Sequence, residues 1–107
     1  MIEITHLFSA LGDPTRFAIV TKLLRDGAQP AGQLQSVAEM SAPAISRHLK
    51  ILRDAGLVHQ RVAGQSRIYS VVPAAVQAIH GWTMDHETFW TGSLERLEAA
   101  LEEHDKS

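Results

Sequence analysis

Short polar and cationic side chains gather in two stretches of the chain between residues 41 and 67. Serine and arginine donate hydrogen bonds to base edges and phosphate oxygens, and small residues beside them let the backbone approach a base closely. Any one of these residues alone would fit a solvated surface, so it is their combination that indicates nucleic-acid binding. The candidate DNA-binding residues are Ser41, Ala42, Pro43, Ala44, Ser46, Arg47 and Lys50 in the first stretch, and Arg61, Gln65, Ser66 and Arg67 in the second.

The charge along the chain agrees with this interpretation. The formal net charge is -2, from 10 basic and 12 acidic residues. Residues 43–72 hold five arginine or lysine residues and one aspartate, whereas residues 73–107 hold two basic and seven acidic residues. Phosphate affinity follows local basic density rather than overall charge. The sequence therefore predicts a positive surface in the middle of a mildly acidic protein.

Length and composition set limits on the class of protein. A chain of 107 residues, 45% hydrophobic and 21% charged, predicts one small globular domain over residues 1–107. The absence of cysteine excludes disulfides, thiolate metal sites and a cysteine nucleophile. No apolar run approaches the roughly 18 residues that a membrane span needs, and the first residues do not open a signal peptide. We expect a cytoplasmic protein without membrane association.

The first polar stretch lies on a predicted helix from about Ala42 to Ala55. Ser41 can cap its start, Pro43 is tolerated in its first turn, and Gly56 signals its end. At 100° per residue its apolar side chains share one face, and the small, polar and basic ones lie opposite. The apolar residues are Ile45, Leu49 and Leu52. His48 lies beside this face, where we expect a hydrogen-bonded packing residue.

Three further helices are predicted before it. A short first helix over about Ile2–Leu11 is ended by Gly12, and a third, weaker helix covers about Pro30–Glu39. The second runs from Pro14 to Asp26, with Asp13 as its N-cap and proline at its first position. The apolar residues of the second helix that mostly repeat at three and four are Phe17, Ile19, Val20, Leu23 and Leu24.

After these helices the pattern changes to strands and then returns to helix. Leu57–Val62 and Arg67–Val72 are strand-like runs around a glycine-containing tip, Ala63–Ser66. From Pro73 to about Leu101 the spacing predicts one long helix, kinked or straight. Four helices, a two-stranded β-hairpin and a last helix form the order of a winged helix-turn-helix, a mainly α chain of the α+β class.

Three segments of the sequence resemble the arsenical-resistance-repressor (ArsR/SmtB) family of bacterial regulators. They read LGDPTRFAIVTKLL, SAPAISRHLKILRDAGLV and AGQSRIYSVVP, and the resemblance covers residues 5 to 100 or so. It implies a homodimer joined through the first and last helices. It also implies an operator bound by Ser46, Arg47 and their neighbours together with the wing from Arg61 to Arg67, and repression relieved by an effector.

The metal sites that this family is known for do not match the sequence. The third-helix thiolate site needs cysteines near residues 32–37, where the chain reads Gly-Gln-Leu-Gln-Ser-Val. The last-helix zinc site needs ligands at Pro73 and Ala75 and near His86 and Phe89, and of these residues only His86 is a ligand type. His80 and His86 are six residues apart, which places them on nearly opposite faces of a straight helix. We expect no metal site and no cofactor.

Three of the six aromatic residues lie in the predicted last helix. The aromatic residues Trp82, Phe89 and Trp90 indicate either a core and dimer contact or the wall of a small-ligand pocket, and both alternatives stay open. A dimer would use the predicted interface residues Leu7, Phe8, Ile79, Trp82, Phe89, Trp90, Leu94 and Leu97.

The sequence favours a regulator over an enzyme. It shows no metal-ligand cluster, glycine-rich phosphate loop or Ser-His-Asp arrangement. The predicted function is a sequence-specific, DNA-binding transcriptional regulator: a homodimeric repressor that binds a palindromic double-stranded DNA operator. An unidentified effector is implied by the resemblance alone, and the residues leave open whether one exists. The alternative is a winged-helix module for protein interaction without sequence-specific DNA binding, in which the acidic last helix docks a partner.

Overall fold

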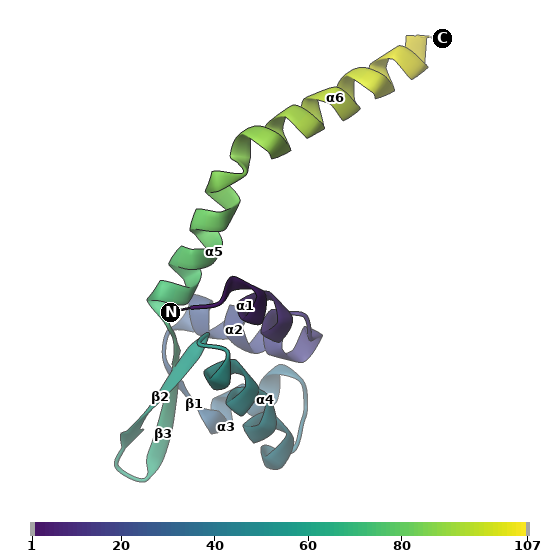
Figure 1. Ribbon diagram of the computed structural model, residues 1–107. Coiled ribbons are helices and arrows are strands. Elements are labelled where there is room, and N and C mark those ends of the chain that lie inside the picture. Colours follow the sequence, from purple (N-terminus) through teal and green to yellow (C-terminus); the bar gives the residue numbers. More distant parts are fainter. Residues whose placement is uncertain (1, 107) are drawn as a thin grey trace.

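The computed structural model describes residues 2–106, with the side chains of all these residues except Glu87, Thr88 and Lys106. Four helical segments lead into a hairpin, and two helices follow it (Figure 1). In chain order the elements are α1 (Ile4–Leu11), α2 (Pro14–Asp26), β1 (Gln29–Pro30), α3 (Ala31–Leu34), the 3-10 turn η1 (Gln35–Val37), α4 (Ala42–Asp54), β2 (Val58–Ala63), β3 (Ser66–Val71), α5 (Pro73–Asp85) and α6 (Glu87–Lys106).

Local capping explains where α2 and α4 begin. The Asp13 carboxylate accepts hydrogen bonds from the backbone N–H groups of Thr15 and Arg16, at 2.9 and 3.1 Å. The Ser41 hydroxyl accepts one from the backbone N–H of Ala44 at 3.3 Å. Each bond satisfies a donor that the first helical turn leaves free. The predicted starts of both helices are confirmed, and the predicted end of α2 at Asp26 is also confirmed.

The core lies where α1, α2, α4 and the base of the hairpin meet. All three apolar residues predicted for the inner face of α4 are buried. On α2 only part of the apolar repeat is buried, because Phe17 and Leu24 are each 58% exposed. The buried core residues are Leu7, Ala10, Ile19, Val20, Leu23, Leu34, Ile45, Leu49, Leu52, Leu57, Val58, Tyr69 and Ala75.

The sheet has three strands rather than the predicted two. Their order is β1-β3-β2, and β1 pairs antiparallel with β3 through Gln29 with Tyr69 and Pro30 with Ile68. Sequence patterns could not reveal β1, since a two-residue strand has no alternation and proline is depleted in strands. β1 attaches the link between α2 and α3 to the hairpin.

The third helix is shorter than predicted. Only Ala31–Leu34 is α-helical, and the 3-10 turn η1 replaces most of the rest of the expected Pro30–Glu39 helix. The segment buries a single large side chain, Leu34, so little packing energy holds a longer helix here. Glu39 ends the segment with a left-handed φ of 51°.

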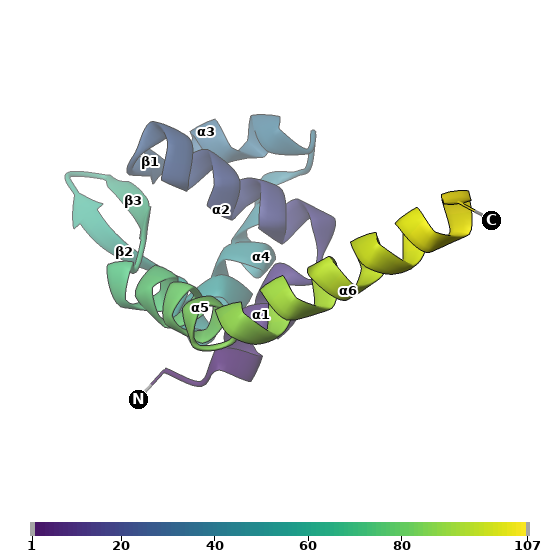
Figure 2. The same cartoon turned by 90° about the horizontal axis from the view of Figure 1, so that it is seen from above.

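The predicted last helix is two helices, with His86 alone between them. The break lies at neither of the two glycines of this segment, since Gly81 is inside α5 and Gly92 is inside α6. The backbone N–H of His86 bonds to the Thr83 carbonyl at 3.2 Å, and the ring Nδ1 lies 2.7 Å from the Trp82 carbonyl oxygen. After this break α6 leads away from the body in both views (Figures 1 and 2), and the molecule measures 66 × 32 × 21 Å.

Candidate nucleic-acid interface

The outer face of α4 is built as the sequence predicts. Ile45, Leu49 and Leu52 anchor the helix in the core, so its orientation is set from behind. The opposite face, turned to solvent, begins at the capped N-terminus with Ala42 and Pro43 and continues with exposed Ser46, Arg47 and Lys50. Ala44 is half-buried. Small residues at the helix start leave room for a close approach by a ligand with a broad surface.

The cations on this face differ in how free they are. In the part of the chain that the structure describes, the Arg47 guanidinium makes no hydrogen bond or ion pair. Lys50 is held 2.9 Å from the Asp54 carboxylate, and this bond keeps the pKa of Asp54 below its ordinary value of 3.8. Arg53 is half-buried with its Nε shielded from solvent, so its guanidinium is less open to phosphate than those of exposed arginines. Arg47 is therefore the cation of α4 best placed to contact a ligand.

The hairpin projects beside α4 as a narrow ribbon (Figure 1). Its register pairs Ala63 with Ser66, so the connecting turn consists of Gly64 and Gln65 only. Gly64 has a φ of 66°, a left-handed conformation that a two-residue hairpin turn requires and that glycine adopts without strain. Residues 61–67 are all exposed, and the two arginines there make no ion pair or hydrogen bond within residues 2–106.

Arg61 and Arg67 lie on opposite faces of the ribbon. Arg61 pairs with Ile68, whereas Arg67 pairs with Val62, and directly paired residues share a face. The face of Arg67 continues toward the body as buried Tyr69 and Val58. The sequence placed both arginines around the tip, but it did not show that they point in opposite directions. A ribbon inserted edge-on into a groove would turn one arginine toward each wall.

Behind the outer face of α4, His48 links this helix to the start of α2. Its Nδ1 is buried, lies 4.0 Å from an Asp13 carboxylate oxygen and has no hydrogen-bond partner among the residues described. The expected packing role is present, whereas the expected hydrogen bond at this nitrogen is not. The Arg16 backbone N–H does most to hold the pKa of Asp13 below its ordinary value of 3.8; the charges of Arg16 and His48 act in the same direction, and partial burial opposes them.

Of the eight residues predicted for a dimer contact, six are exposed, one is half-buried and one is fully buried. Phe8 of α1 and Trp82 of α5 are exposed, and their rings meet edge to face with centroids 5.4 Å apart. Phe89, Trp90, Leu94 and Leu97 are exposed on α6. Leu7 differs, because it is fully buried inside its own chain and has no surface to offer a partner. Ile79 is half-buried against the core.

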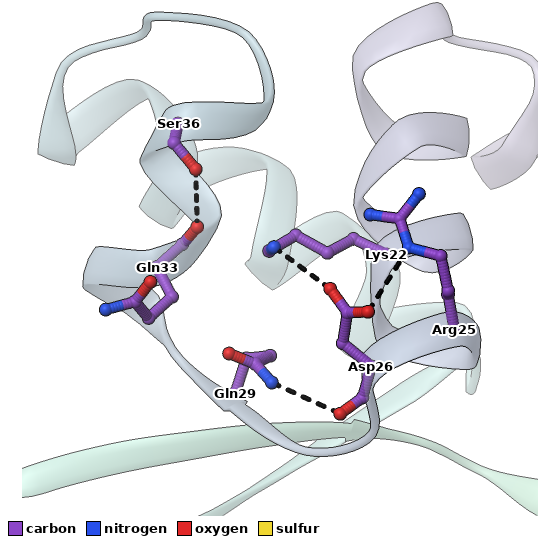
Figure 3. A network of polar contacts seen from close by, with 6 residues as sticks. All are labelled: Lys22, Arg25, Asp26, Gln29, Gln33 and Ser36. Carbon is purple, nitrogen blue, oxygen red and sulfur yellow. Dashed lines mark hydrogen bonds and ion pairs between the residues drawn. The ribbon is translucent and has the colours of Figure 1, made fainter.

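Polar contacts occupy the end of α2 and the nearby segment 32–37, where the family's thiolate site would lie (Figure 3). Asp26 accepts from Lys22 at 3.1 Å and from Arg25 at 3.2 Å, and these two bonds, that of Arg25 first, lower the pKa of its carboxyl. Gln29 donates to the Asp26 backbone carbonyl at 3.3 Å, and Ser36 donates to the Gln33 carbonyl at 2.9 Å. Among the residues that the structure describes, no three histidine, aspartate or glutamate side chains gather to hold a metal.

Comparison with known proteins agrees with this arrangement. A helix-turn-helix domain family matches residues 11–61. The chain is 40% identical to the HTH-type transcriptional regulator Rv2034 of Mycobacterium tuberculosis, over 81% of this chain and 78% of that protein. It is 34% identical to the arsenic resistance transcriptional regulator ArsR1 of Pseudomonas putida, over 78% of this chain and 68% of that protein. The solved structure of an ArsR-like transcriptional regulator from Rhodococcus superposes with a TM-score of 0.69 at 29% identity, covering 88% of each chain. No helix within residues 2–106 is long and apolar enough to cross a membrane.

Proposed function

The chain belongs to the ArsR/SmtB family of DNA-binding transcriptional regulators, and we propose that it works as a homodimeric repressor that reads its operator with α4 and the hairpin wing. Its relatives are regulators and not enzymes. The observation that carries the proposal is the free Arg47 guanidinium beside Ser46 on the outer face of a helix whose inner face is buried. Side chains held on a rigid helix can reach base edges in the major groove with little loss of conformational entropy.

The wing supplies the second part of the contact. Arg61, Gln65, Ser66 and Arg67 lie at or beside a turn that is exposed on all sides. With one arginine on each face, the ribbon suits a groove whose two walls are phosphate backbones. The complete proposed contact set is Ser41, Ala42, Pro43, Ala44, Ser46, Arg47 and Lys50 from α4 and its cap, with Arg61, Gln65, Ser66 and Arg67 from the wing.

Two copies would join through the helices at the two ends of one winged helix-turn-helix domain. The exposed apolar residues of α1, α5 and α6 support this, because a monomer rarely leaves so many large apolar side chains in water. A two-fold axis would then place two α4 helices about 34 Å apart, one turn of DNA, on a palindromic operator. The proposed interface residues are Phe8, Ile79, Trp82, Phe89, Trp90, Leu94 and Leu97, without Leu7.

Genomic fragments captured by the protein, followed by footprinting, test this function. We expect protection of two inverted half-sites centred about 10 bp apart. A protein-interaction module would enrich no sequence, and it would bind duplex DNA no better than an acidic protein of equal size. We propose that the effector that relieves repression is not a thiophilic metal, because the chain has no thiolate ligand.

A further inference from the structure

A groove with an almost wholly apolar lining, which we call the apolar groove, opens between α2 and α5. It measures about 270 Å³, and its lining includes Val20 and Leu24 of α2, Val76 of α5 and Leu57. Leu24 is 58% exposed and Val76 is 39% exposed, so the core leaves both side chains partly in water. A ligand that covers them gains from removing apolar surface from water on both sides of the contact. The apolar groove therefore suits the hydrocarbon part of a small molecule.

A second hollow, which we call the basic hollow, lies between α2 and η1. It measures about 500 Å³, and its lining includes Lys22 and Arg25 of α2 and Ser36 and Val37 of η1. Figure 3 shows the Lys22 side chain reaching from α2 toward the segment that carries Ser36. Both cations contact the Asp26 carboxylate, at 3.1 and 3.2 Å, and two positive charges against one negative charge leave a net charge of +1. The basic hollow therefore suits a group with a single negative charge.

The apolar groove and the basic hollow adjoin on the outer surface of α2. Phe17 and Thr21, one helical turn apart, line both of them. At 100° per residue, the other α2 residues of the basic hollow lie on one side of this pair, and those of the apolar groove lie on the other. Thr21 is the smaller of the two shared residues, and its hydroxyl donates to the Phe17 carbonyl at 2.8 Å. Because that proton is in use, an anionic group gains no hydrogen bond at Thr21 and is better placed beside the two cations.

We infer that the chain binds a small amphipathic carboxylate across α2, with the carboxylate in the basic hollow and the hydrocarbon chain in the apolar groove. The inference rests on the repressor proposed above and gives the chemical class of its effector. A single carboxylate matches the net charge of the basic hollow and accepts hydrogen bonds from ammonium and guanidinium groups. A ligand with a second charge at its other end would bury that charge without a partner in the apolar groove.

The position of this site connects ligand binding with the helix that contacts DNA. Helix α2 packs against both η1 and α4. The turn η1 ends at Val37, shortly before α4 begins at Ala42. A ligand held between α2 and η1 therefore contacts the segment that leads into α4. If the carboxylate binds more tightly to an arrangement of these elements that fits the operator poorly, it lowers the operator affinity through the same free-energy difference. We expect the carboxylate to weaken operator binding.

Calorimetric titration with decanoate tests the site without DNA. We expect one decanoate to bind per subunit. Decyltrimethylammonium keeps the chain and reverses the charge, so it should bind at least about tenfold more weakly. Acetate keeps the charge and lacks the chain, so it should show no measurable binding. In NMR spectra of the decanoate complex, the amide signals of Thr21, Val37 and Val76 should move, because these residues line the ridge, the basic hollow and the apolar groove.

Two pairs of variants assign the two ends of the ligand. Lys22→Gln removes a cation from the basic hollow, and Leu24→Gln places a polar group in the apolar groove at an exposed position that the fold tolerates. Each should raise the decanoate dissociation constant about tenfold. Arg96→Gln and Leu101→Gln are the matched controls on α6, where Arg96 is exposed and Leu101 is 57% exposed, close to the 58% of Leu24. Both controls should leave the dissociation constant unchanged.

The outcomes separate this inference from the proposed function. A protein that binds its operator but binds no stoichiometric decanoate, or binds decyltrimethylammonium equally well, would overturn the site and leave the repressor standing. Stoichiometric binding with the expected variant pattern, in a protein that protects no DNA, would support the site and contradict the repressor. Anisotropy of a labelled operator then tests the coupling: decanoate should weaken operator binding by the wild type, and far less by Lys22→Gln at the same concentration. An operator affinity that is unchanged at saturating decanoate would overturn the effector role.

Discussion

At the level of single residues, Arg47 and Arg67 are both exposed and have no ion-pair partner among the described residues, but the elements that carry them differ. Arg47 lies on a helix anchored by three buried side chains, and Arg67 lies two residues past a two-residue turn. The outer face of α4 could be predicted because helical periodicity and capping are local. The opposite directions of Arg61 and Arg67 could not, since they depend on the hairpin register, and a shift of one residue reverses every side chain.

This difference predicts two kinds of loss on alanine substitution. Arg47→Ala should weaken binding to the operator by about 1–3 kcal/mol per subunit and binding to random duplex much less, because base contacts carry sequence information. Arg67→Ala should weaken binding to the operator and to random duplex equally, because phosphate contacts carry no sequence information. It should also reduce the salt dependence of binding by about one unit of slope per lost contact. Fluorescence anisotropy titrations measure the affinity of each of the two variants for the operator and for random duplex. Equal losses on both duplexes for Arg47→Ala would show that the assigned roles are reversed.

Asp13 gives a prediction in acid. Its folded-state pKa lies below the ordinary 3.8, so its carboxylate stabilises the folded state above that value, and this contribution is lost as the pH falls through the folded pKa. Asp13→Asn keeps a capping side chain but cannot ionise. The stability difference between wild type and Asp13→Asn, from urea unfolding, should be largest near pH 7 and should shrink below about pH 4. A difference that is constant from neutral to acid pH would show that the charge of Asp13 contributes nothing.

At the level of elements, the sequence predicted the features that depend on neighbouring residues, such as helix caps. It did not predict the features that depend on contacts between distant parts of the chain. The starts of α2 and α4 follow from Asp13 and Ser41, each a cap followed by proline in the first helical turn. Strand β1 exists only because β3 is already there to pair with it, and α3 is cut short because it buries little. The break at His86 has no glycine or proline beside it, and the sequence therefore carried no signal for it.

Ser41 tests the contribution of a cap to α4 independently of DNA. Ser41→Ala removes the acceptor for the Ala44 N–H and should lower the free energy of unfolding by about 1 kcal/mol. Ser46→Ala is the control, since it makes the same chemical change at an exposed position inside the helix, where alanine is well tolerated. Chemical unfolding without DNA compares the two. Equal effects of both substitutions would mean that the Ser41 bond does not stabilise the helix.

At the level of the whole molecule, the basic and acidic residues occupy different parts. Five of the ten basic residues lie on α4 and the wing at one end, and six of the twelve acidic residues lie on α6, which leads away from that end (Figure 1). This separation keeps an overall charge of -2 compatible with DNA binding, because screening limits repulsion to distances of about 10 Å. The last helix, α6, contacts little of the rest of the described chain, and sequence patterns could not show that it leads away from the body.

Metals should not release the protein from DNA. Zinc, cadmium and arsenite each need thiolate or clustered imidazole and carboxylate ligands, and the chain has no cysteine. We expect the anisotropy of a protein–operator complex to stay constant as each ion is added to one equivalent per subunit. Tight stoichiometric zinc binding coupled to DNA release would reveal a site formed between subunits, with His80 or His86 as its first candidate ligands.

The salt dependence of operator binding by the dimer tests the central claim most directly. If Lys50, Arg61 and Arg67 of each copy contact phosphates, six contacts should lower the affinity about 10³-fold between 50 and 200 mM salt. The same titration on random duplex should give a similar slope and a weaker affinity at every salt concentration. An affinity that does not depend on salt, or equal affinities for both duplexes, would contradict a regulator that reads DNA with α4 and clamps it with the wing.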